Sequence, residues 1–418
     1  MMNTPYDEIA KTPMAGATKE QAHDLRREGE LLIKAGNNYI DGGMRRLDLA
    51  RELLACPKTG EEPCECPPDE GNEDDPGHEH PDHPAPEGTF IKHPLPTIAS
   101  NFDTQPLYEP RSEAPKNSSD VVGAFRMNVP SSHLLFDDPI VYPGQPGKAH
   151  LHEFFGNFGA DAFSTYESLR TTGDSNAMNR LNRSSYWLPA LFYDDHHVLR
   201  GDYGTVYYKQ RPSDDPIIEQ WGAEPIQMPN GLRFIVGHTM NGGPVTGKPY
   251  VKANVGGTYP DLEALLAEVP RDQITALYFA VTGPSLWDGE NLDSPDHRSH
   301  VGNLEFGAHT DWKQKAVAPI NTLIPQITFI RKHTILPEDD MSQFRLSSDE
   351  MAGTPRGGSM HMDFFEAWDE DAKNALISGA INDFRNCSNG DFGNGTGMKH
   401  DHWNNKAEPR LVPIPERG

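Results

Sequence analysis

Alternation of apolar and polar residues is the strongest structural pattern in the middle of this chain. Short runs rich in aromatic and β-branched residues recur there, bounded by Gly, Pro, Asn or Asp, which is typical of strands separated by turns. Because the spacing is irregular and the connections are long, the pattern predicts a mainly β domain over residues 97–397: an antiparallel β-sandwich or jelly-roll-like fold with long loops and a few helices. The clearest runs are 184–193 (SSYWLPALFY), 204–211 (GTVYYKQR), 231–239 (GLRFIVGHT), 276–283 (ALYFAVTG) and 325–335 (PQITFIRKHTI).

Helical periodicity occurs near the start of the chain and twice inside the β-rich region. Two apolar stripes separated by AGNNYIDGG predict an N-terminal helical hairpin over residues 1–56. Such a hairpin must bury its apolar face, either on the main domain or on a second copy or a larger assembly. Short helices are expected at 261–268 and 369–383, and the polar tail 398–418 is expected to be an extended arm.

Residues 57–96 differ sharply in composition from what precedes and follows them. They contain ten prolines, and residues 57–88 contain eleven Asp or Glu against one Lys. A segment of this kind cannot bury enough apolar surface to fold alone. We therefore expect an acidic, proline-rich linker with an extended structure.

Net charge excludes some partners. The chain has 37 Lys and Arg against 62 Asp and Glu, a formal charge of −25. This argues against a nucleic-acid partner, which requires a basic footprint. No apolar run approaches the ~20 residues of a transmembrane helix. The first residues, MMNTPYDEIAKTPMAG, contain no apolar signal-peptide core, so we expect the protein to stay in the cytoplasm or to leave as part of a particle.

Candidate chemistry begins with the stretch 148–157, KAHLHEFFGN. On a strand, His150 and His152 would project from the same face, because residues two apart share a face. Leu151 and Phe155 would then point to the core, and Glu153 on that same side breaks the pattern. The sequence therefore predicts a bulge or strand end near Glu153 and places the histidine pair at the rim of a sheet.

Two further segments combine histidine with carboxylate. The stretch NLDSPDHRSH contains Pro and Ser and is expected to be a loop, whereas His361 and Asp363 in GGSMHMDFFEAWD would share one face of a strand. We expect the three segments to converge in space, because buried polar groups of this kind are costly without partners. The candidate catalytic residues and metal ligands are His150, His152, His297, His300, His361 and Asp363, with Arg298 as a further catalytic candidate.

Convergence of these residues suits two kinds of chemistry. Imidazole nitrogens and carboxylate oxygens can bind a divalent metal ion. A histidine with a pKa near neutrality can instead transfer protons without any metal. No glycine-rich phosphate loop and no GxSxG motif occurs in the sequence.

Several motifs, in order along the chain, resemble those of the domain of unknown function DUF1996. They are VPSSH, DPIVYPGQPGKAHLHEFFGN, STYESLR, SSYWLPALFY, GLRFIVGHT, SLWDGENLDSPDHRSHV and GGSMHMDFFEAWD, and they cover roughly residues 122–390. The family has no established activity, so the resemblance assigns no catalytic residues. Domains of this family often occur beside carbohydrate-binding WSC modules in secreted fungal proteins. Secreted members usually have cysteine where Ser285 stands here, so a disulfide is not expected at that position.

Two functions remain open at this point. The first is an enzyme acting on polysaccharide. A lyase would use a histidine or tyrosine base, with Arg298 or a metal stabilising an enolate, and a hydrolase would use a carboxylate pair such as Asp293 and Asp363. The second is a non-catalytic glycan-binding or structural module, tethered by the N-terminal hairpin to a larger assembly such as a virion or a cell-surface particle.

Overall fold

The computed structural model describes residues 95–417, apart from 113–114, 173, 217, 219–223, 241–245, 304–321 and 401–408. These residues fall within one structural unit, Thr89–Gly418. The predicted N-terminal hairpin, and the predicted linker as far as residue 94, lie outside the described residues.

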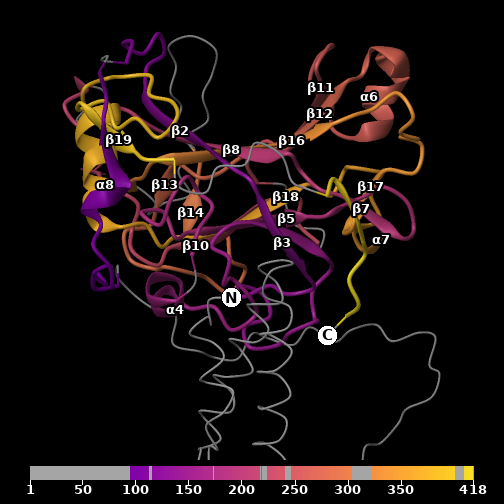
Figure 1. The fold of residues 1–418 in the computed structure, drawn as a ribbon, viewed down its shortest axis with the longest axis horizontal. Helices are drawn as coiled ribbons and strands as arrows, with labels where there is room; N and C mark the ends of the chain where they lie inside the picture. The colour runs from indigo at the N-terminus through magenta and orange to yellow at the C-terminus, as the bar shows by residue number, and fades with distance from the viewer. Residues whose placement is uncertain are drawn as a thin grey trace, which may run out of the picture. The chain divides into compact units, whose positions relative to one another are not determined.

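Two five-stranded antiparallel sheets form the centre of this unit (Figure 1). The fold is mainly β with few helices, as predicted, and each of the five alternating runs contains a strand. The first sheet has the order β10-β18-β5-β4-β3 and the second β11-β12-β16-β8-β2. The strands of the first sheet are β10 (Arg233–Gly237), β18 (His361–Phe365), β5 (Ser185–Pro189), β4 (His152–Gly156) and β3 (Ser131–Leu135). Those of the second are β11 (Tyr250–Ala253), β12 (Ala276–Thr282), β16 (Gln326–Thr334), β8 (Tyr203–Gln210) and β2 (Gly123–Val129).

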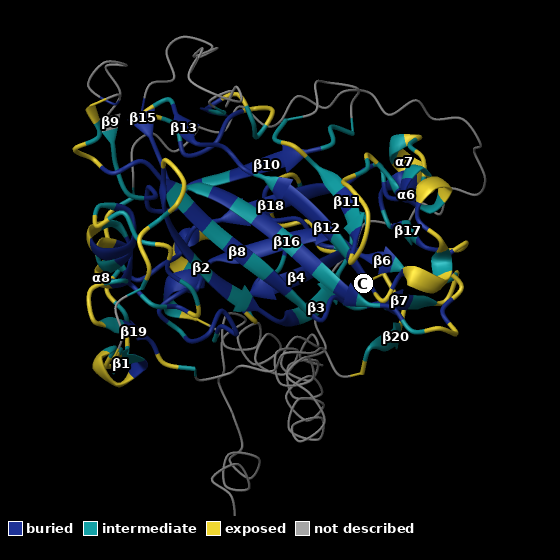
Figure 2. Ribbon diagram, turned by 90° about the horizontal axis from the view of Figure 1, so that it is seen from above, coloured by how far each residue is buried: buried dark blue, intermediate teal, exposed yellow. Residues whose placement is uncertain are grey.

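Alternate residues of the first sheet face the second sheet and build the main core. Phe155 of β4 lies with its ring centroid 5.2 Å from that of Phe329 in β16, and Tyr186 of β5 lies 5.7 Å from the same ring. These contacts make the two sheets a sandwich. Figure 2 shows the buried residues concentrated in its strands and the exposed ones in peripheral loops and short helices.

Glu153, the residue that broke the predicted alternation, faces this core in an ion pair. Its Oε2 lies 3.2 Å from Arg331 Nη1 of β16, and both side chains are fully buried. Its Oε1 accepts a hydrogen bond from the Gly201 backbone N–H at 2.7 Å. The partner across the sandwich therefore explains a carboxylate at a core position. The prediction was a bulge or a strand end near Glu153, and β4 does begin at His152. β4 itself pairs regularly with β5, and the register shift lies in the neighbouring strand β3, between Ser131 and Leu134, opposite Phe155 and Glu153.

Short helices and small sheets surround the sandwich. The helix predicted at 261–268 is α6 (Leu262–Glu268), whose N-cap Asp261 accepts a hydrogen bond from the Ala264 N–H. The helix predicted at 369–383 is capped by Asp369 and changes to π-helical geometry after its first turns. The other elements of that region and the remaining helices are η1 (Gln105–Leu107), α4 (Tyr166–Thr171), η2 (Arg271–Gln273), α7 (Asp349–Ala352), α8 (Glu370–Ala375) and η3 (Leu376–Ile381).

The small sheets attach the remaining loops and the end of the chain. In the predicted C-terminal arm, β20 pairs antiparallel with β7. Among the described residues, no helix has the length and apolar character needed to cross a membrane. The strands of the small sheets are β1 (Tyr108–Pro110), β6 (Leu191–Phe192), β7 (His197–Leu199), β9 (Glu224–Pro225), β13 (Leu286–Trp287), β14 (Val301–Gly302), β15 (Thr322–Leu323), β17 (Arg345–Leu346), β19 (Thr396–Met398) and β20 (Leu411–Pro413).

Candidate metal centre

Two histidines lie on the outer face of the first sheet, opposite the main core. His152 opens β4 and His361 opens β18, and β5 lies between the two strands. The register pairs His152 with Pro189, and continuing the β18–β5 register beyond Asp363 and Trp187 brings His361 to the same level. Because only the small ring of Pro189 separates them, the two imidazoles can lean toward one another. Their ring centroids are 6.0 Å apart.

His150 joins this pair from outside the sheet. It lies in a bend two residues before β4 begins, so its position depends on that bend and not on the two-residue repeat of a strand. Its Nε2 lies 3.2 Å from Nε2 of His361, and its ring centroid lies 4.0 Å from that of His152. Each histidine offers one nitrogen to a cluster in which all three lie within 4.8 Å of one another.

Backbone carbonyls fix the orientation of the two strand histidines. Nδ1 of His152 lies 2.9 Å from the Asp137 carbonyl oxygen, and Nδ1 of His361 lies 2.8 Å from the Ser359 carbonyl oxygen. A carbonyl can only accept, so each Nδ1 must carry the proton of a neutral ring. The Nε2 atoms of His152 and His361 are therefore unprotonated.

A serine fixes the third ring in the same way. Nδ1 of His150 lies 3.0 Å from Ser347 Oγ, and this hydroxyl donates its own proton to the Leu151 carbonyl oxygen at 2.6 Å. With its proton used, Ser347 Oγ accepts from His150 Nδ1, and the Nε2 of His150 is also unprotonated.

The unprotonated Nε2 atoms of three histidines therefore lie close together in a buried part of the domain. His152 is 1% exposed and His361 is 5% exposed, and Nε2 of His152 has no hydrogen-bond partner among the described residues. Burial and the neighbouring imidazoles lower the pKa of His152 to about 3, and they lower the pKa of His150 and of His361 well below the usual value. Two unprotonated nitrogens 3.2 Å apart repel each other unless a cation lies between them, and two ligands of a tetrahedral zinc ion lie about 3.3 Å apart for bonds of ~2.05 Å. The donor set therefore fits a divalent metal ion.

Asp363 places a carboxylate beside this cluster. Its Oδ2 lies 3.8 Å from Nε2 of His361, the side chain is 1% exposed, and neither oxygen has a hydrogen-bond partner among the described residues. Burial, together with the nearby Asp138, raises the pKa of Asp363 well above its usual value, and Arg298 opposes this rise. The cluster whose ligand atoms lie within 4.8 Å of one another does not include Asp363, which was also predicted as a ligand. A carboxylate in this position can hold a proton next to the metal, and it would become a fourth ligand only if its side chain moved closer to the three nitrogens.

The loop 293–300 runs along the edge of the same sheet. The Ile235 N–H of β10 donates to the His297 carbonyl oxygen at 3.0 Å. Nδ1 of His297 lies 2.8 Å from Asp293 Oδ1, whose other oxygen lies 3.3 Å from Nε of Arg233. This loop therefore lies against β10, the strand that pairs with β18 and its His361, but the histidine cluster does not include His297.

The other two candidates in this loop make structural contacts. His300 uses both ring nitrogens, one with Ser294 Oγ at 2.8 Å and one with the Arg233 carbonyl oxygen at 2.9 Å, so it has no free ligand atom. Arg298 donates to Thr246 Oγ1 at 2.8 Å and to the His238 carbonyl oxygen at 2.9 Å. Its positive charge still lowers the pKa of His361 and opposes the raised pKa of Asp363.

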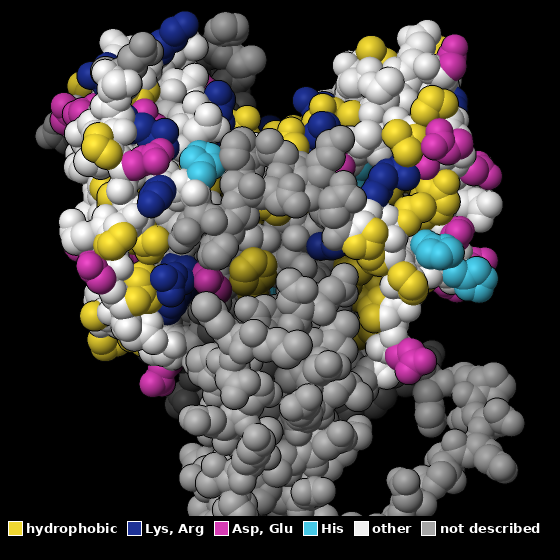
Figure 3. Space-filling view, in the orientation of Figure 1, with side chains coloured by type: hydrophobic (Ala, Val, Ile, Leu, Met, Phe, Trp, Pro, Cys, Tyr) yellow, Lys and Arg dark blue, Asp and Glu magenta, His cyan; other side chains and the backbone are white. Residues whose placement is uncertain are grey.

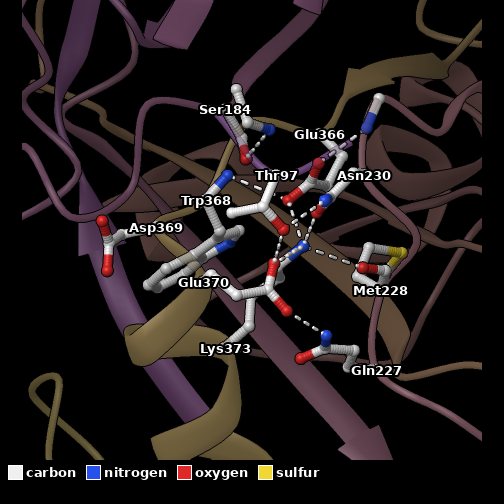
Figure 4. A network of polar contacts seen from close by, with 12 residues as sticks. Thr97, Ser184, Gln227, Met228, Asn230, Glu366, Trp368, Asp369, Glu370 and Lys373 are labelled. Atoms are coloured by element: carbon white, nitrogen blue, oxygen red, sulfur yellow. Dashed lines mark hydrogen bonds and ion pairs between the residues drawn. The ribbon is translucent and has the colours of Figure 1, made fainter. Parts of the chain in front are cut away.

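A second buried charge cluster lies where the motif containing His361 and Asp363 ends (Figure 4). The carboxylate of Glu366 accepts backbone N–H groups from Gly231 at 2.8 Å and Trp368 at 2.9 Å, and it lies 3.2 Å from Lys373 Nζ. Lys373 also contacts the side chain of Asn230. The carboxylate of Glu366 and the ammonium of Lys373 are thus paired with each other and with neighbouring polar groups. This pairing anchors α8 to the end of β18, and we assign these two residues no catalytic or ligand-binding role.

Sequence patterns identified the three ligand candidates but not the residues that orient them. Ser347 is 197 positions from His150, and Asp137 and Ser359 act through their backbone. No sequence signal marks such contacts. Asp138, whose pKa is raised to about 6, mainly by burial, was also missed, although the turn residues DDP around it are visible.

The family model of the domain of unknown function DUF1996 matches residues 138–368, so this mainly β, histidine-bearing domain is a DUF1996 domain and the chain belongs to that family. The matched span includes all seven candidate site residues. No curated protein and no solved structure matches the chain.

Proposed function

We propose that this protein is a metal-dependent enzyme acting on polysaccharide, by hydrolysis or elimination, and that His150, His152 and His361 hold its metal ion. The convergence of three unprotonated, oriented Nε2 atoms carries the proposal. Three protein nitrogens with a free further position are the arrangement of catalytic zinc sites. A divalent ion held there lowers the pKa of a bound water or neutralises a sugar carboxylate.

The surrounding side chains have distinct roles in this proposal. Ser347 and the carbonyls of Asp137 and Ser359 hold the imidazoles in the metal-binding tautomer. Asp363, buried and without a hydrogen-bond partner among the described residues, takes up or delivers a proton beside the metal. Polysaccharide as the substrate class rests on the association of the family with carbohydrate-binding modules, which is an analogy and not a property of this site.

Enclosure of the site favours a second candidate, a non-catalytic module. His152, His361 and Asp363 are at most 5% exposed, and only His150 retains partial exposure. If Asp363 completes a four-ligand shell, the site is closed, as in structural zinc sites. The metal then stabilises a domain that binds glycan or attaches to an assembly.

Cobalt substitution separates the two candidates. We expect Co²⁺ to give the visible spectrum of a site with three nitrogen ligands, and we expect azide to change that spectrum because one position is open. Turnover of a panel of neutral and uronate-containing polysaccharides should require the metal and should be lost in His152→Ala. A spectrum that azide leaves unchanged, together with no turnover of any glycan, would favour the closed structural site.

A second variant guards against simple unfolding. The side chain of His197 is 44% exposed at the start of β7 and pairs with Asp194 at 3.0 Å, away from the histidine cluster, so His197→Ala is the matched control for histidine removal. We expect His197→Ala to keep both the cobalt spectrum and the turnover. If both histidine variants lose turnover equally, the loss does not come from the cluster and the proposal fails.

A further inference from the structure

The outer face of the second sheet lies on the side of the sandwich opposite the histidine cluster. Buried residues that face the core alternate there with partly exposed ones, most regularly in β8 and β16. Figure 2 looks onto this face and shows the alternation along both strands. In Figure 3 the molecule is hollowed at the top, between two lobes, where Figure 1 places β8 and β16. The face is therefore a recessed surface that solvent reaches.

Basic and aromatic side chains dominate this face, and acidic ones are missing from it. Among the residues that the five strands direct outward, four are tyrosine, four are Lys or Arg, and none is Asp or Glu. The chain as a whole has a formal charge of −25, so the face differs in sign from the rest of the molecule. Its four cations are Arg126, Lys209, Lys252 and Lys332.

Strand register orders half of these side chains into one row. Lys252 of β11 lies opposite Tyr278 of β12, which lies opposite Lys332 of β16, and Lys332 lies opposite Tyr203 of β8. The two ammonium groups lie 5.2 Å and 5.4 Å from the ring centroids of Tyr278 and Tyr203. Lys332 also lies 3.5 Å from Asp202 at the rim. Because neighbouring strands are about 4.8 Å apart, the Cα atoms of the two lysines are about 10 Å apart, a spacing comparable to two pyranose units.

A second group lies toward the other edge of the sheet. Tyr207 of β8 lies opposite Arg126 of β2. The guanidinium of Arg126 lies 5.7 Å from the ring centroid of Tyr207, and the ammonium of Lys209 lies 5.2 Å from it. Within the described part of the chain, neither Arg126 nor Lys209 forms an ion pair with a carboxylate, and the same holds for Lys252. These three cations therefore remain available to an anionic ligand.

The spacing of the cations favours a polymer with sparse negative charges. A uronate polysaccharide has at most one carboxylate per sugar, and its hydroxyls can bond to the tyrosine hydroxyls between the cations. Single-stranded nucleic acid fits less well, because its bases stack on open aromatic faces and a cation already lies over three of the four rings. Its dense phosphate charge is also repelled more strongly by a chain with a formal charge of −25.

We propose that the outer face of the second sheet binds a linear acidic polysaccharide through its uronate carboxylates. Lys252 on β11 and Arg126 on β2 contact the polymer at opposite edges of the sheet, and Lys209 contacts it between them. Because the histidine cluster lies on the other side of the sandwich, this surface holds a different segment of the polymer from any at the metal centre. The inference depends neither on the metal ion nor on turnover.

The test is isothermal titration calorimetry on the full chain, with metal removed by a chelator. The probes are polygalacturonate, alginate and hyaluronate, beside fully methyl-esterified polygalacturonate, dextran and single-stranded DNA. We expect at least one acidic polysaccharide to bind saturably and more weakly as salt is raised, because salt screens exposed ion pairs. The esterified polymer, which lacks the charge, should not bind. Binding without metal separates this result from any failure of the metal centre.

Two double variants with the same change in net charge locate the binding. Lys252→Met with Arg126→Met removes a cation from each edge of the face. The matched control is Lys148→Met with Arg345→Met: Lys148 is exposed and precedes His150 by two residues, and Arg345 lies 5.2 Å from the ring centroid of Phe192 in a small sheet. We expect the first double variant to weaken binding about tenfold, through the loss of two exposed ion pairs, and the control to leave it unchanged.

Three results would overturn the proposal. One is that none of the acidic polysaccharides binds. Another is that the two double variants lose affinity equally, which would trace binding to net charge and not to this face. The third is that single-stranded DNA or the esterified polymer binds as tightly as the acidic polysaccharides.

Discussion

Replacing Glu153 by Gln should destabilise the sandwich more than any surface charge change. The substitution keeps the shape of the side chain but leaves the fully buried guanidinium of Arg331 without a counter-charge. At 3.2 Å, the lost attraction is on the order of 5 kcal/mol for an effective dielectric constant of about 20. Breaking a buried pair from one side typically costs about 3–5 kcal/mol. We expect a loss in that range.

Arg331 provides the complementary test. The Nε and Nη2 atoms of Arg331 have no hydrogen-bond partner among the described residues. The described residues therefore do not compensate fully for removing this charge from water. Replacing both partners, as in Glu153→Leu with Arg331→Met, should therefore recover most of the loss, because no unpaired charge remains. This outcome would show that the stability lost in Glu153→Gln comes from leaving the positive charge of Arg331 buried without a counter-charge.

Urea unfolding followed by tryptophan fluorescence measures these differences as shifts in the free energy of unfolding. The matched control is Asp195→Asn, because the carboxylate of Asp195 pairs with Arg345 at 2.8 Å but is 79% exposed. We expect the control to cost no more than about 1 kcal/mol. A Glu153→Gln effect as small as that of the control, or a double variant less stable than the single one, would refute the reasoning.

Three further predictions concern the site and its support. Ser347→Ala should weaken metal affinity about 10–100-fold in a competition titration, because it releases the ring of His150, whereas Ser342→Ala, an exposed serine bonded to Asp340, should change nothing. In metal-free protein, Asp138 has a pKa raised from 3.8 to about 6, so its contribution to stability is full below pH 3.8 and is lost as the pH rises through 6. Asp138→Asn should then stabilise the protein at pH 7, by up to about 3 kcal/mol, but not at pH 3.5, and equal effects at both pH values would contradict this. Gly204→Ala should cost about 1–3 kcal/mol in urea unfolding, because the new methyl group would meet the Phe329 ring at 2.1 Å, while Gly257→Ala, with nothing within 4 Å, serves as the control.

Local patterns predicted the strands and helices well because each depends on near neighbours in the sequence. The alternation in GTVYYKQR and PQITFIRKHTI became β8 and β16, and Asp261 caps α6. Glu153 shows where such patterns stop: its position in the core depends on Arg331, 178 residues away. Because local patterns do not reveal that partner, the sequence suggested a bulge or a strand end near Glu153; β4 begins one residue earlier, at His152, and Glu153 lies within its regular pairing with β5.

The candidate site was predictable in its residue types but not in its geometry. His150 and His152 attracted attention as a strand pair, yet only His152 lies in β4. The third member of the cluster, His361, lies near the other two because of the order of the strands: β5 lies between β4 and β18, so the first residues of these two strands face each other across it. His300 had the same apparent promise but turned inward to Ser294 and Arg233. Spacing predicts what a residue can do, whereas the register of distant strands decides which residues meet.

Metal stoichiometry is the most direct test of the central claim, that His150, His152 and His361 form a metal-binding centre. The full chain would be loaded with Zn²⁺, freed of excess metal by gel filtration and analysed by inductively coupled plasma mass spectrometry, beside His361→Ala and the control His197→Ala. We predict one tightly held ion per chain in the wild type and in His197→Ala, and loss of that ion in a folded His361→Ala. A wild-type chain that retains no metal, or a His361→Ala chain that retains as much as the wild type, would contradict the account.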